Sequence, residues 1–437
     1  MKLKPYPKYK DSGIQWIGKI PENWKIHRIK FLLSTIESGG REEGGGASLD
    51  KGAFSLGGEH INWDGTLDIE HERFISEEYY YTMNKGKIKL GDILLVKDGA
   101  TIGKTAILTE KPFEKMAVNE HVFLMRSNKR ICSKLLYYLI CGDSGFTQIK
   151  LTETGSAQGG INLEFPDIVL VTITEDLNNQ EDISSFLDSK ISQVDQTIEK
   201  DKQLIELLKE KRTALINHVV TKGLNPKAKM KDSGIEWIGE VPEGWEVKKI
   251  KYFTVEKRNK ATELDESGHF VGLENIEPMS GKVFSYNSTE NMEGESLKFK
   301  KNQVLFCKLR PYLAKVVVAD IDGFCTSELI IYECDKKTNP TYLRYRLLSN
   351  GYIDYVNSLT EGVKMPRADP VLLSNIKLPL PPLSEQLQIS SYLDKSTSKI
   401  DQTIQKIEEK IEFLEEYKKS LIHHVVTGKV DVRDAVA

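Results

Sequence analysis

Two different segments of this amino-acid sequence each occur twice, in the order A-B-A′-B′. Segment A, DSGIQWIGKIPENW at 11–24, returns as DSGIEWIGEVPEGW at 232–245. Segment B, ISSFLDSKISQVDQTIEK at 183–200, returns as ISSYLDKSTSKIDQTIQK at 389–406. The stretches between the repeats are dissimilar, so a repeated frame presents two variable centres. This order predicts two halves related by a pseudo-two-fold internal repeat.

Length and composition limit the class of protein. At 437 residues the chain can hold two or more domains, each with its own core. No apolar run reaches the length of a membrane span, and the opening MKLKPYPKYK lacks the hydrophobic segment of a signal peptide. The five cysteines form no CxxC and no Cys/His cluster. We therefore expect reduced thiols, no metal, no membrane partner and a cytoplasmic location.

The charge balance argues against a generic nucleic-acid binder. The formal net charge is −3, and both variable centres are close to neutral. Proteins that bind nucleic acid through charge alone are strongly basic. If DNA is the ligand, the positive charge must lie on one local face or come partly from a partner.

Each copy of segment B begins a long heptad pattern. Apolar residues recur at alternating spacings of four and three, without Gly or Pro, which is typical of a coiled-coil seam. Each helix of about 36–40 residues would be roughly 55–60 Å long. The predicted seam residues are Leu187, Ile191, Val194, Ile198, Ile205, Leu208 and Leu215 in the first helix, and Leu393, Ile400, Ile404, Ile407, Ile411, Leu414 and Leu421 in the second.

The two seams predict that the helices pair with each other. They match in register, and each is narrower than the apolar face of a helix on a globular core. The alternative is that each helix packs on its own domain. We expect antiparallel pairing, because a parallel pair would crowd both centres together. Arg212 and Lys418 interrupt the seams at equivalent positions, and we expect them to snorkel near a helix end.

The centres, residues 26–175 and 247–380, lack heptads and alternate short apolar runs with turn signals. GDILLVKDG at 91–99 predicts a strand, and SKLLYYLICG predicts a helix. The predicted fold class is α+β: two mixed α/β domains alternating with two long helices that pair as an antiparallel coiled coil. The predicted boundaries are 1–175 for the first domain, 176–224 for the first helix, 225–383 for the second domain, and 384–437 for the second helix and tail.

No catalytic motif is complete. GATIGKT at 99–105 has one residue too few for a P-loop and precedes an expected strand, where phosphate binding needs a helix. NPTY at 339–342 lacks the second proline of the adenine methyltransferase motif, and no glycine-rich cofactor loop accompanies it. A self-sufficient methyltransferase is therefore disfavoured, and we expect no catalytic residue and no cofactor in this chain.

Segment A contains two equivalent tryptophan pairs and one equivalent aspartate pair. For Asp11 and Asp232 we expect a cap or turn role. For Trp16 and Trp237, and for Trp24 and Trp245, we expect buried aromatic anchors.

Together these segments resemble the specificity subunit of type I DNA restriction-modification systems. The resemblance covers nearly the whole chain. It is carried by DSGI-x-WIG-x-(I/V)-P-E-x-W in both halves and by LPLPPLSEQLQISSYLDKSTSKIDQTI at 378–404 with the ending SLIHHVVTGKV. KLRPYLAKV at 308–316 and GVKMPRADP at 362–370 add to it. One departure is that the first half lacks the proline run before Gln180, which aligns with Gln386, so the shape of the first helix start is open.

The resemblance implies a non-catalytic subunit with two target-recognition domains. Each domain would bind one half of a split, asymmetric site in double-stranded DNA. The helices would set the spacing and dock two methyltransferase subunits that use S-adenosylmethionine. Restriction subunits, which use ATP and Mg for translocation and cleavage, would join this core.

The candidate DNA-binding residues are basic and amide side chains in expected loops, because Arg and Lys bind guanine edges or phosphates and Gln binds adenine. They are Lys97, Lys104 and Gln158 in the first domain, and Lys308, Arg310, Lys364 and Arg367 in the second. The alternative function is a structural scaffold that holds two ligand-binding domains apart without DNA, which the neutral centres favour slightly.

Overall fold

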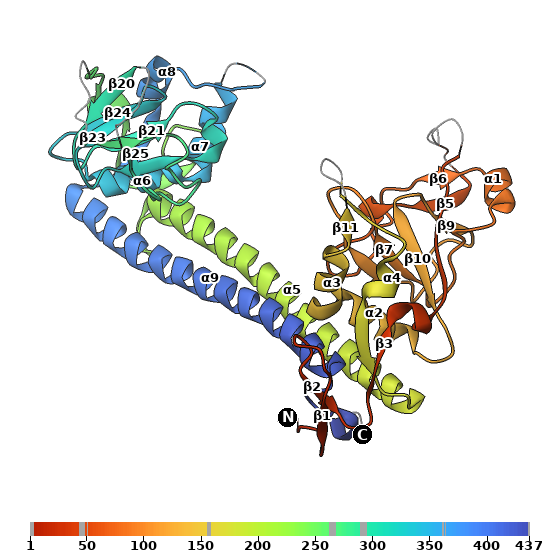
Figure 1. The fold of residues 1–437 in the computed structure, drawn as a ribbon. Helices are drawn as coiled ribbons and strands as arrows, with labels where there is room; N and C mark the ends of the chain where they lie inside the picture. Colours follow the sequence, from red (N-terminus) through yellow and green to blue (C-terminus); the bar gives the residue numbers. More distant parts are fainter. Residues whose placement is uncertain are drawn as a thin grey trace. The chain divides into compact units, whose positions relative to one another are not determined.

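The structure is a computed structural model that describes residues 4–42, 49, 51–154, 159–261, 268–288, 295–360, 362 and 364–435 (Figure 1). The chain forms two compact units, Met1–Lys200 with Lys410–Ala437, and Asp201–Glu409. Each unit combines one centre with segments of both long helices. Among the described helices, none is both long and apolar enough to cross a membrane.

The first unit is built around a four-stranded antiparallel sheet of order β4-β10-β7-β8. Its central strand β7 (Ile93–Val96) is entirely buried because both faces of the sheet are covered. Ile93 and Leu95 lie in the main core, whereas Leu94 and Val96 lie in a second apolar cluster. This burial on both faces explains why the strand is an uninterrupted apolar run in the sequence.

Among its described residues, the unit contains further strands and four short helices. Its strands are β1 (Tyr9–Asp11), β2 (Lys19–Pro21), β3 (Lys25–Arg28), β4 (Leu33–Ser38), β5 (Ala53–Leu56), β6 (Phe74–Ile75), β8 (Thr105–Ile107), β9 (Met116–Val118), β10 (Val122–Ser127), β11 (Glu153–Thr154), β12 (Gly160–Ile161) and β13 (Leu170–Ile173). Its short helices are α1 (Glu77–Thr82), α2 (Ser133–Cys141), α3 (Asp143–Lys150) and α4 (Phe165–Ile168).

The second unit contains elements most of which have a counterpart in the first. Its strands are β14 (Met230–Asp232), β15 (Glu240–Pro242), β16 (Glu246–Lys249), β17 (Thr254–Lys257), β18 (His269–Val271), β19 (Asn287–Ser288), β20 (Ser296–Phe299), β21 (Val304–Cys307), β22 (Val316–Val318), β23 (Gly323–Thr326), β24 (Leu329–Cys334) and β25 (Lys377–Leu380). Its short helices are α6 (Pro340–Leu348), α7 (Asn350–Ser358) and α8 (Pro370–Asn375).

The two centres share one topology although their sequences are dissimilar. The sheet β4-β10-β7-β8 corresponds to β17-β24-β21-β22. The parallel pair β5–β9 corresponds to β18–β23, and the antiparallel pair β3–β13 corresponds to β16–β25. From α2 and α6 to β13 and β25, equivalent residues are 207 positions apart. The predicted pseudo-two-fold repeat therefore extends through the centres, although their sequences are dissimilar.

The long helices are α5 (Leu177–Lys222) and α9 (Leu383–Val426), and they begin at equivalent residues. The missing proline run does not change the first helix start, because one buried glutamine holds both starts alike. Gln180 accepts from the Cys132 amide at 2.9 Å and donates to the carbonyls of Arg130 and Thr174 at 3.0 and 2.7 Å. Gln386 accepts from the Asn339 amide at 2.8 Å and donates to the carbonyls of Lys337 and Pro381 at 3.0 and 2.8 Å.

Within each unit the segments of α5 and α9 run antiparallel (Figure 1), and the predicted fold class is confirmed. Of the predicted seam residues, eight are buried and six are half-buried. The buried ones are Leu187, Val194, Ile198, Ile205, Leu393, Ile400, Ile407 and Leu421. The half-buried ones are Ile191, Leu208, Leu215, Ile404, Ile411 and Leu414.

The snorkelling expected of Arg212 and Lys418 is wrong. Arg212 pairs with Asp401 across the helices at 2.9 Å, and its side chain is only 10% exposed. Lys418 pairs with Asp195 at 2.7 Å, which is the same pair in the other half. Neither side chain extends to solvent, because each cation is bonded to an equivalent carboxylate of the other helix. The two pairs fix the antiparallel register of the helices.

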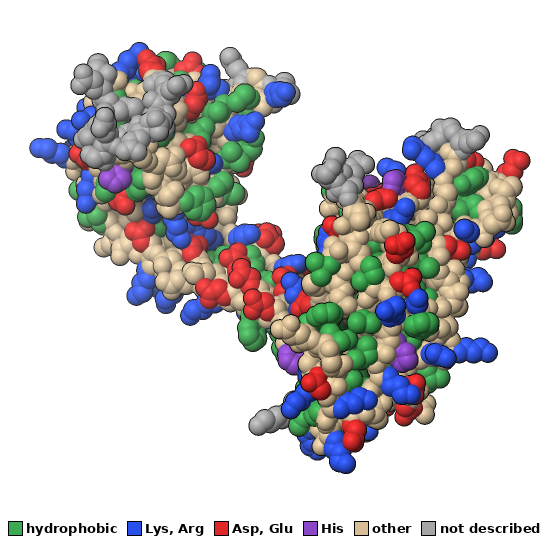
Figure 2. Space-filling view, viewed as in Figure 1, with side chains coloured by type: hydrophobic (Ala, Val, Ile, Leu, Met, Phe, Trp, Pro, Cys, Tyr) green, Lys and Arg blue, Asp and Glu red, His purple; other side chains and the backbone are tan. Residues whose placement is uncertain are grey.

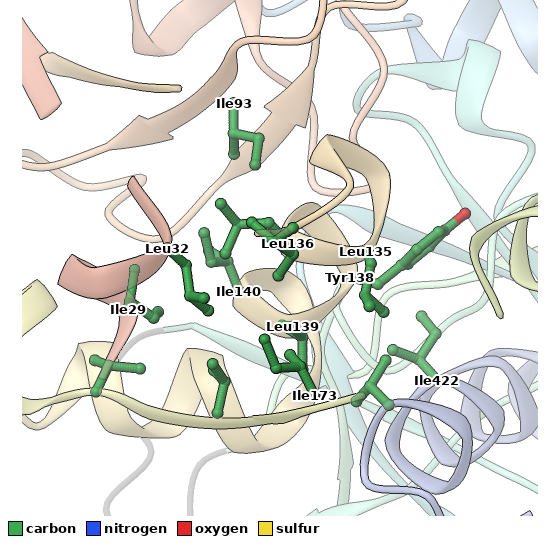
Figure 3. Packing of buried hydrophobic residues seen from close by; sticks show 14 of the residues in the cluster. Ile29, Leu32, Ile93, Leu135, Leu136, Tyr138, Leu139, Ile140, Ile173 and Ile422 are labelled. Carbon is green, nitrogen blue, oxygen red and sulfur yellow. The ribbon is translucent and has the colours of Figure 1, made fainter. Parts of the chain in front are cut away.

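Each copy of segment A closes a core at the end of a long helix. In the first unit Trp24 is buried, and Lys429, just beyond α9, donates to the carbonyls of Ile17 and Lys19 at 2.7 and 2.5 Å. In the second unit Trp245 is buried, and Lys222 at the end of α5 donates to the carbonyl of Glu240 at 2.9 Å. Figure 3 shows the first core, where Ile422 of α9 lies near Leu135 and Ile173.

Gln386→Ala should lower the free energy of unfolding by about 2–4 kcal/mol, because the backbone groups that it bonds are left unpaired in a buried place. The shift in the urea midpoint measures this. Gln402→Ala on the exposed face of the same helix is the control and should change the free energy by less than about 0.5 kcal/mol. Equal effects of the two changes would show that the buried amide does not hold the helix start.

Candidate nucleic-acid interface

The loop between β21 and β22, residues 308–315, carries the candidate residues Lys308 and Arg310. Arg310 begins a 3-10 turn, Pro311–Leu313, and has φ 49°, a left-handed conformation that is strained for a residue with a side chain. Its amide donates to the carbonyl of Pro366 at 2.8 Å, which ties the loop to the next candidate segment. Arg310 and Tyr312 are exposed at the loop surface.

The segment that contains Lys364 and Arg367 lies beside this loop. Leu309 and Arg367 form an antiparallel bridge, and the Ala368 amide donates to the carbonyl of Lys308 at 2.9 Å. The structure therefore brings Arg367 beside Lys308 and Arg310, although Arg367 follows them by more than 50 residues in the sequence. Lys364 is exposed three residues before Arg367.

These four cations are not equally available to a ligand. The ammonium of Lys308 donates to the Ser327 carbonyl at 2.7 Å, and the Arg367 guanidinium pairs with Glu328 at 2.8 Å. Among the described residues, Arg310 and Lys364 have no ion-pair partner, and both are exposed. Arg310 and Lys364 are therefore the cations that can bind an incoming phosphate or base edge without first breaking a contact.

The first unit presents the same hairpin between β7 and β8, residues 97–104. Asp98 bridges to Gly160, and the Ile161 amide donates to the carbonyl of Lys97 at 2.7 Å, as Ala368 does to Lys308. Gly99, with φ 87°, is equivalent to Arg310, and Gly103, with φ 94°, is equivalent to Ala314. All four residues have a left-handed backbone conformation. Sequence reasoning missed the equivalence of the two hairpins because most of their residues differ in type. The one shared signal is the spacing of Lys97 and Lys104, which is the same as that of Lys308 and Lys315.

The cations of this first hairpin are less free than Arg310. Lys97 is half-buried, lies 3.6 Å from Asp98 and sits over the ring of Phe123 at 5.4 Å. Asp98 also pairs with His121 at 2.5 Å. Lys104 is half-buried at the other end of the loop, and Gln158 lies outside the described residues. His121 and Lys315 are polar groups near the hairpins that the sequence analysis did not select.

Two incomplete motifs have structural roles. GATIGKT lies in the β7–β8 hairpin, and its last residue, Thr105, begins strand β8. Asn339 of NPTY caps α6 by accepting from the Tyr342 amide at 2.9 Å. Burial raises the pKa of Cys307 to about 11, so that this thiol next to Lys308 stays protonated and is a poor nucleophile at neutral pH.

Segment A meets its expectations in part. Asp11 and Asp232 accept from the amides of Gly13 and Gly234, both at 2.9 Å, in identical turns. Trp24 and Trp245 are each 1% exposed. Trp16 is not the expected buried anchor, since it is 58% exposed, whereas Trp237 is half-buried.

Acidic and basic side chains are interspersed over the faces seen in Figure 2, in keeping with the near-neutral composition. The fold and the two hairpins define a class of protein: two similar recognition units, each with its own loop chemistry, on one pair of long helices.

Residues 242–412 match the family model of the type I restriction modification DNA specificity domain. The chain is 22% identical to the type I restriction enzyme EcoDI specificity subunit of Escherichia coli, over 85% of this chain and 81% of that protein. It is 25% identical to the putative type I restriction enzyme MjaX specificity subunit of Methanocaldococcus jannaschii, over 95% of this chain and 96% of that protein.

Solved structures share the fold over nearly the whole chain. A chain from a structure of a type I R-M system aligns with a TM-score of 0.69 at 14% identity, covering 94% of this chain and 99% of that one. The HsdS subunit from Thermoanaerobacter tengcongensis aligns with a TM-score of 0.56 at 13% identity, covering 94% and 98%. These comparisons confirm the resemblance, seen in the sequence, to the specificity subunits of type I restriction-modification systems.

Arg310→Gly should raise the free energy of unfolding by about 0.5–1 kcal/mol, because the left-handed conformation costs about 1–2 kcal/mol with a side chain and glycine returns part of that as chain entropy. Urea unfolding measures the change. Gly99→Ala is the reciprocal control: a Cβ there meets open space, so only the backbone conformation can lower stability. If Arg310→Gly were destabilising, the left-handed assignment would be wrong.

Proposed function

We propose that this chain binds double-stranded DNA at a bipartite, asymmetric site, and that each unit binds one half of it. The hairpins 97–104 and 308–315 would lie against the base edges, together with the segments beside them. The observation that carries the proposal is that one topology presents different side chains at equivalent places, with Gly99 and Thr101 in one unit and Arg310 and Tyr312 in the other. Different side chains on the same frame favour different base sequences.

The exposed cations give the second unit a specific chemistry. Arg310 can donate two parallel hydrogen bonds to the O6 and N7 of guanine, and Lys364 can bind a phosphate. Arg367 can exchange its bond to Glu328 for a contact with DNA. In the first unit Lys97 and Lys104 flank the hairpin, and Gln158 is the candidate for adenine. The near-zero net charge implies that affinity comes partly from a partner.

We further propose that the long helices dock two methyltransferase subunits. Leu207 and Phe413 are at equivalent positions of α5 and α9 and are 61% and 66% exposed. Large apolar side chains at exposed, equivalent positions support contact with two copies of one partner. Those subunits would use S-adenosylmethionine, and restriction subunits that use ATP and Mg would complete the assembly.

Arg310→Ala should weaken discrimination at one half-site by about 1–3 kcal/mol, because one guanine contact is lost. The measurement is methylation of a DNA library by the complex of this chain with its methyltransferase subunits. Lys377→Ala, which removes an exposed cation from β25 in the same unit, is the matched control. Relaxed preference at both half-sites, or an equal effect of the control, would contradict the assignment of Arg310.

Ile198→Asp combined with Ile404→Asp should prevent assembly with the methyltransferase subunits, because unpaired carboxylates in the seam cost several kcal/mol. Size-exclusion chromatography of the co-expressed subunits measures this. The control is Gln196→Asp with Gln402→Asp, which places the same charges at exposed, equivalent positions of the same helices. A complex of normal size and activity with both seam residues changed would rule out the proposed seam.

A further inference from the structure

The two units differ around the equivalent tryptophans Trp16 and Trp237 of segment A. In the second unit the ring of Tyr355 stacks on Trp237, with centroids 5.2 Å apart and planes inclined by 15°. In the first unit Trp16 is 58% exposed and borders an open pocket of about 540 Å³. The same segment therefore carries a covered ring in one unit and an uncovered ring in the other.

Two substitutions on α3 account for the uncovered ring. Gln148 stands where α7 has Tyr355, and its amide turns inward to bond both backbone groups of Leu170, each at 2.9 Å. Ser144 is equivalent to Gly351 of α7. Trp237 packs so closely on Gly351 that a Cβ atom added to this glycine would lie 3.3 Å from the ring. The first unit thus lacks the aromatic ring that covers the tryptophan in the second unit. It also has the Ser144 side chain at the place where Trp16 would have to pack.

Three residues around Trp16 are apolar where the second unit has polar ones. Leu151, Ile168 and Leu170 line the pocket, and the first two are 81% and 57% exposed. The equivalent residues of the second unit are Ser358, Asn375 and Lys377. Exposed apolar residues in place of polar ones, around an exposed tryptophan, are the composition of a protein–protein contact.

The second unit also indicates what such a pocket holds. Its own Tyr355 supplies an aromatic ring to Trp237, whereas no described residue of the first unit stacks on Trp16, so a ring that covers Trp16 would come from another molecule. Asp143 is exposed at the pocket in the first unit, and its carboxylate disfavours a nucleic-acid strand with its phosphates. His423 in the lining belongs to α9, which in this unit also carries the exposed Phe413 and Tyr417, so that a subunit docked on α9 can reach the pocket.

We propose that this pocket binds an aromatic side chain of one methyltransferase subunit, once per chain. The inference rests on the proposed function, because it names a partner of the assembly. Since the second unit fills the equivalent place with Tyr355, only one of the two methyltransferase subunits makes this contact. The pocket therefore distinguishes the two otherwise equivalent docking places on the helices.

Photo-crosslinking in the assembled complex tests the pocket directly. With p-benzoylphenylalanine at Leu151, irradiation should join this chain to a methyltransferase segment that contains Tyr, Phe or Trp. The same group at Ser358, the equivalent position of the second unit, should give no crosslink to that segment. Crosslinks from Leu151 to DNA, to a restriction subunit or to a second copy of this chain would overturn the proposal.

Matched variants separate a binding role from a structural one. Trp16→Ala and Ile168→Asn should leave the thermal midpoint unchanged and weaken binding of one methyltransferase subunit about tenfold or more, as expected for an aromatic anchor. Trp237→Ala should instead lower the midpoint, because its ring is stacked within the unit. If the Trp16→Ala and Ile168→Asn variants bound the methyltransferase subunits with unchanged affinity and methylated a bipartite site normally, this inference alone would be wrong. If the unmodified complex methylated no bipartite site, the proposed function would be contradicted.

Discussion

The antiparallel pairing of α5 and α9 is the interaction on which the rest of the structure depends. Leu187 near the start of α5 lies in the core of the first unit, and Ile216 near its end lies in the core of the second. α9 does the reverse, with Leu393 in the second core and Leu421 in the first. Neither core is complete without both helices, so the direction of pairing determines whether either unit can fold.

The two ion pairs give that pairing its direction. Arg212 meets Asp401 and Lys418 meets Asp195, and these are one interaction repeated in the two halves. From Asp195 to Arg212 the chain moves forward along α5, while their partners move backward along α9 from Lys418 to Asp401. A parallel arrangement therefore cannot form both pairs. Arg212 also donates to the carbonyls of Met279 and Ser280 at 3.0 and 2.9 Å, so in the second unit the same side chain ties the helices to the centre.

Much of the frame could be predicted because its signals are periodic or repeated. The heptads predicted the long helices, and the duplicated segments predicted two halves. The shared topology of the centres could not be predicted, since the positions that align, such as Gly99 and Arg310, share a backbone conformation and not a residue type. The role of Arg212 was missed because its partner is 189 residues away. The exposure of Trp16 was missed because it depends on what replaces Tyr355 on a separate helix.

The candidate DNA contacts were likewise predictable only in part. Sequence reasoning selected Lys308, Arg310 and Arg367, and the structure places them on one loop pair. It could not rank them, because the carbonyl of Ser327 and the carboxylate of Glu328 that engage Lys308 and Arg367 become visible only in the folded chain. Arg310, which has no such partner among the described residues and keeps a strained backbone where the other unit has glycine, stands out for that reason.

The central claim is that two structurally equivalent units bind DNA independently of each other. Its most direct test is to exchange residues 247–380 for the corresponding stretch of a relative with a different specificity and to map the methylated sites across a genome by single-molecule sequencing. The account predicts that one half of a split recognition sequence changes while the other half stays the same. A change in both halves, or a recognition sequence without an unread gap, would contradict it.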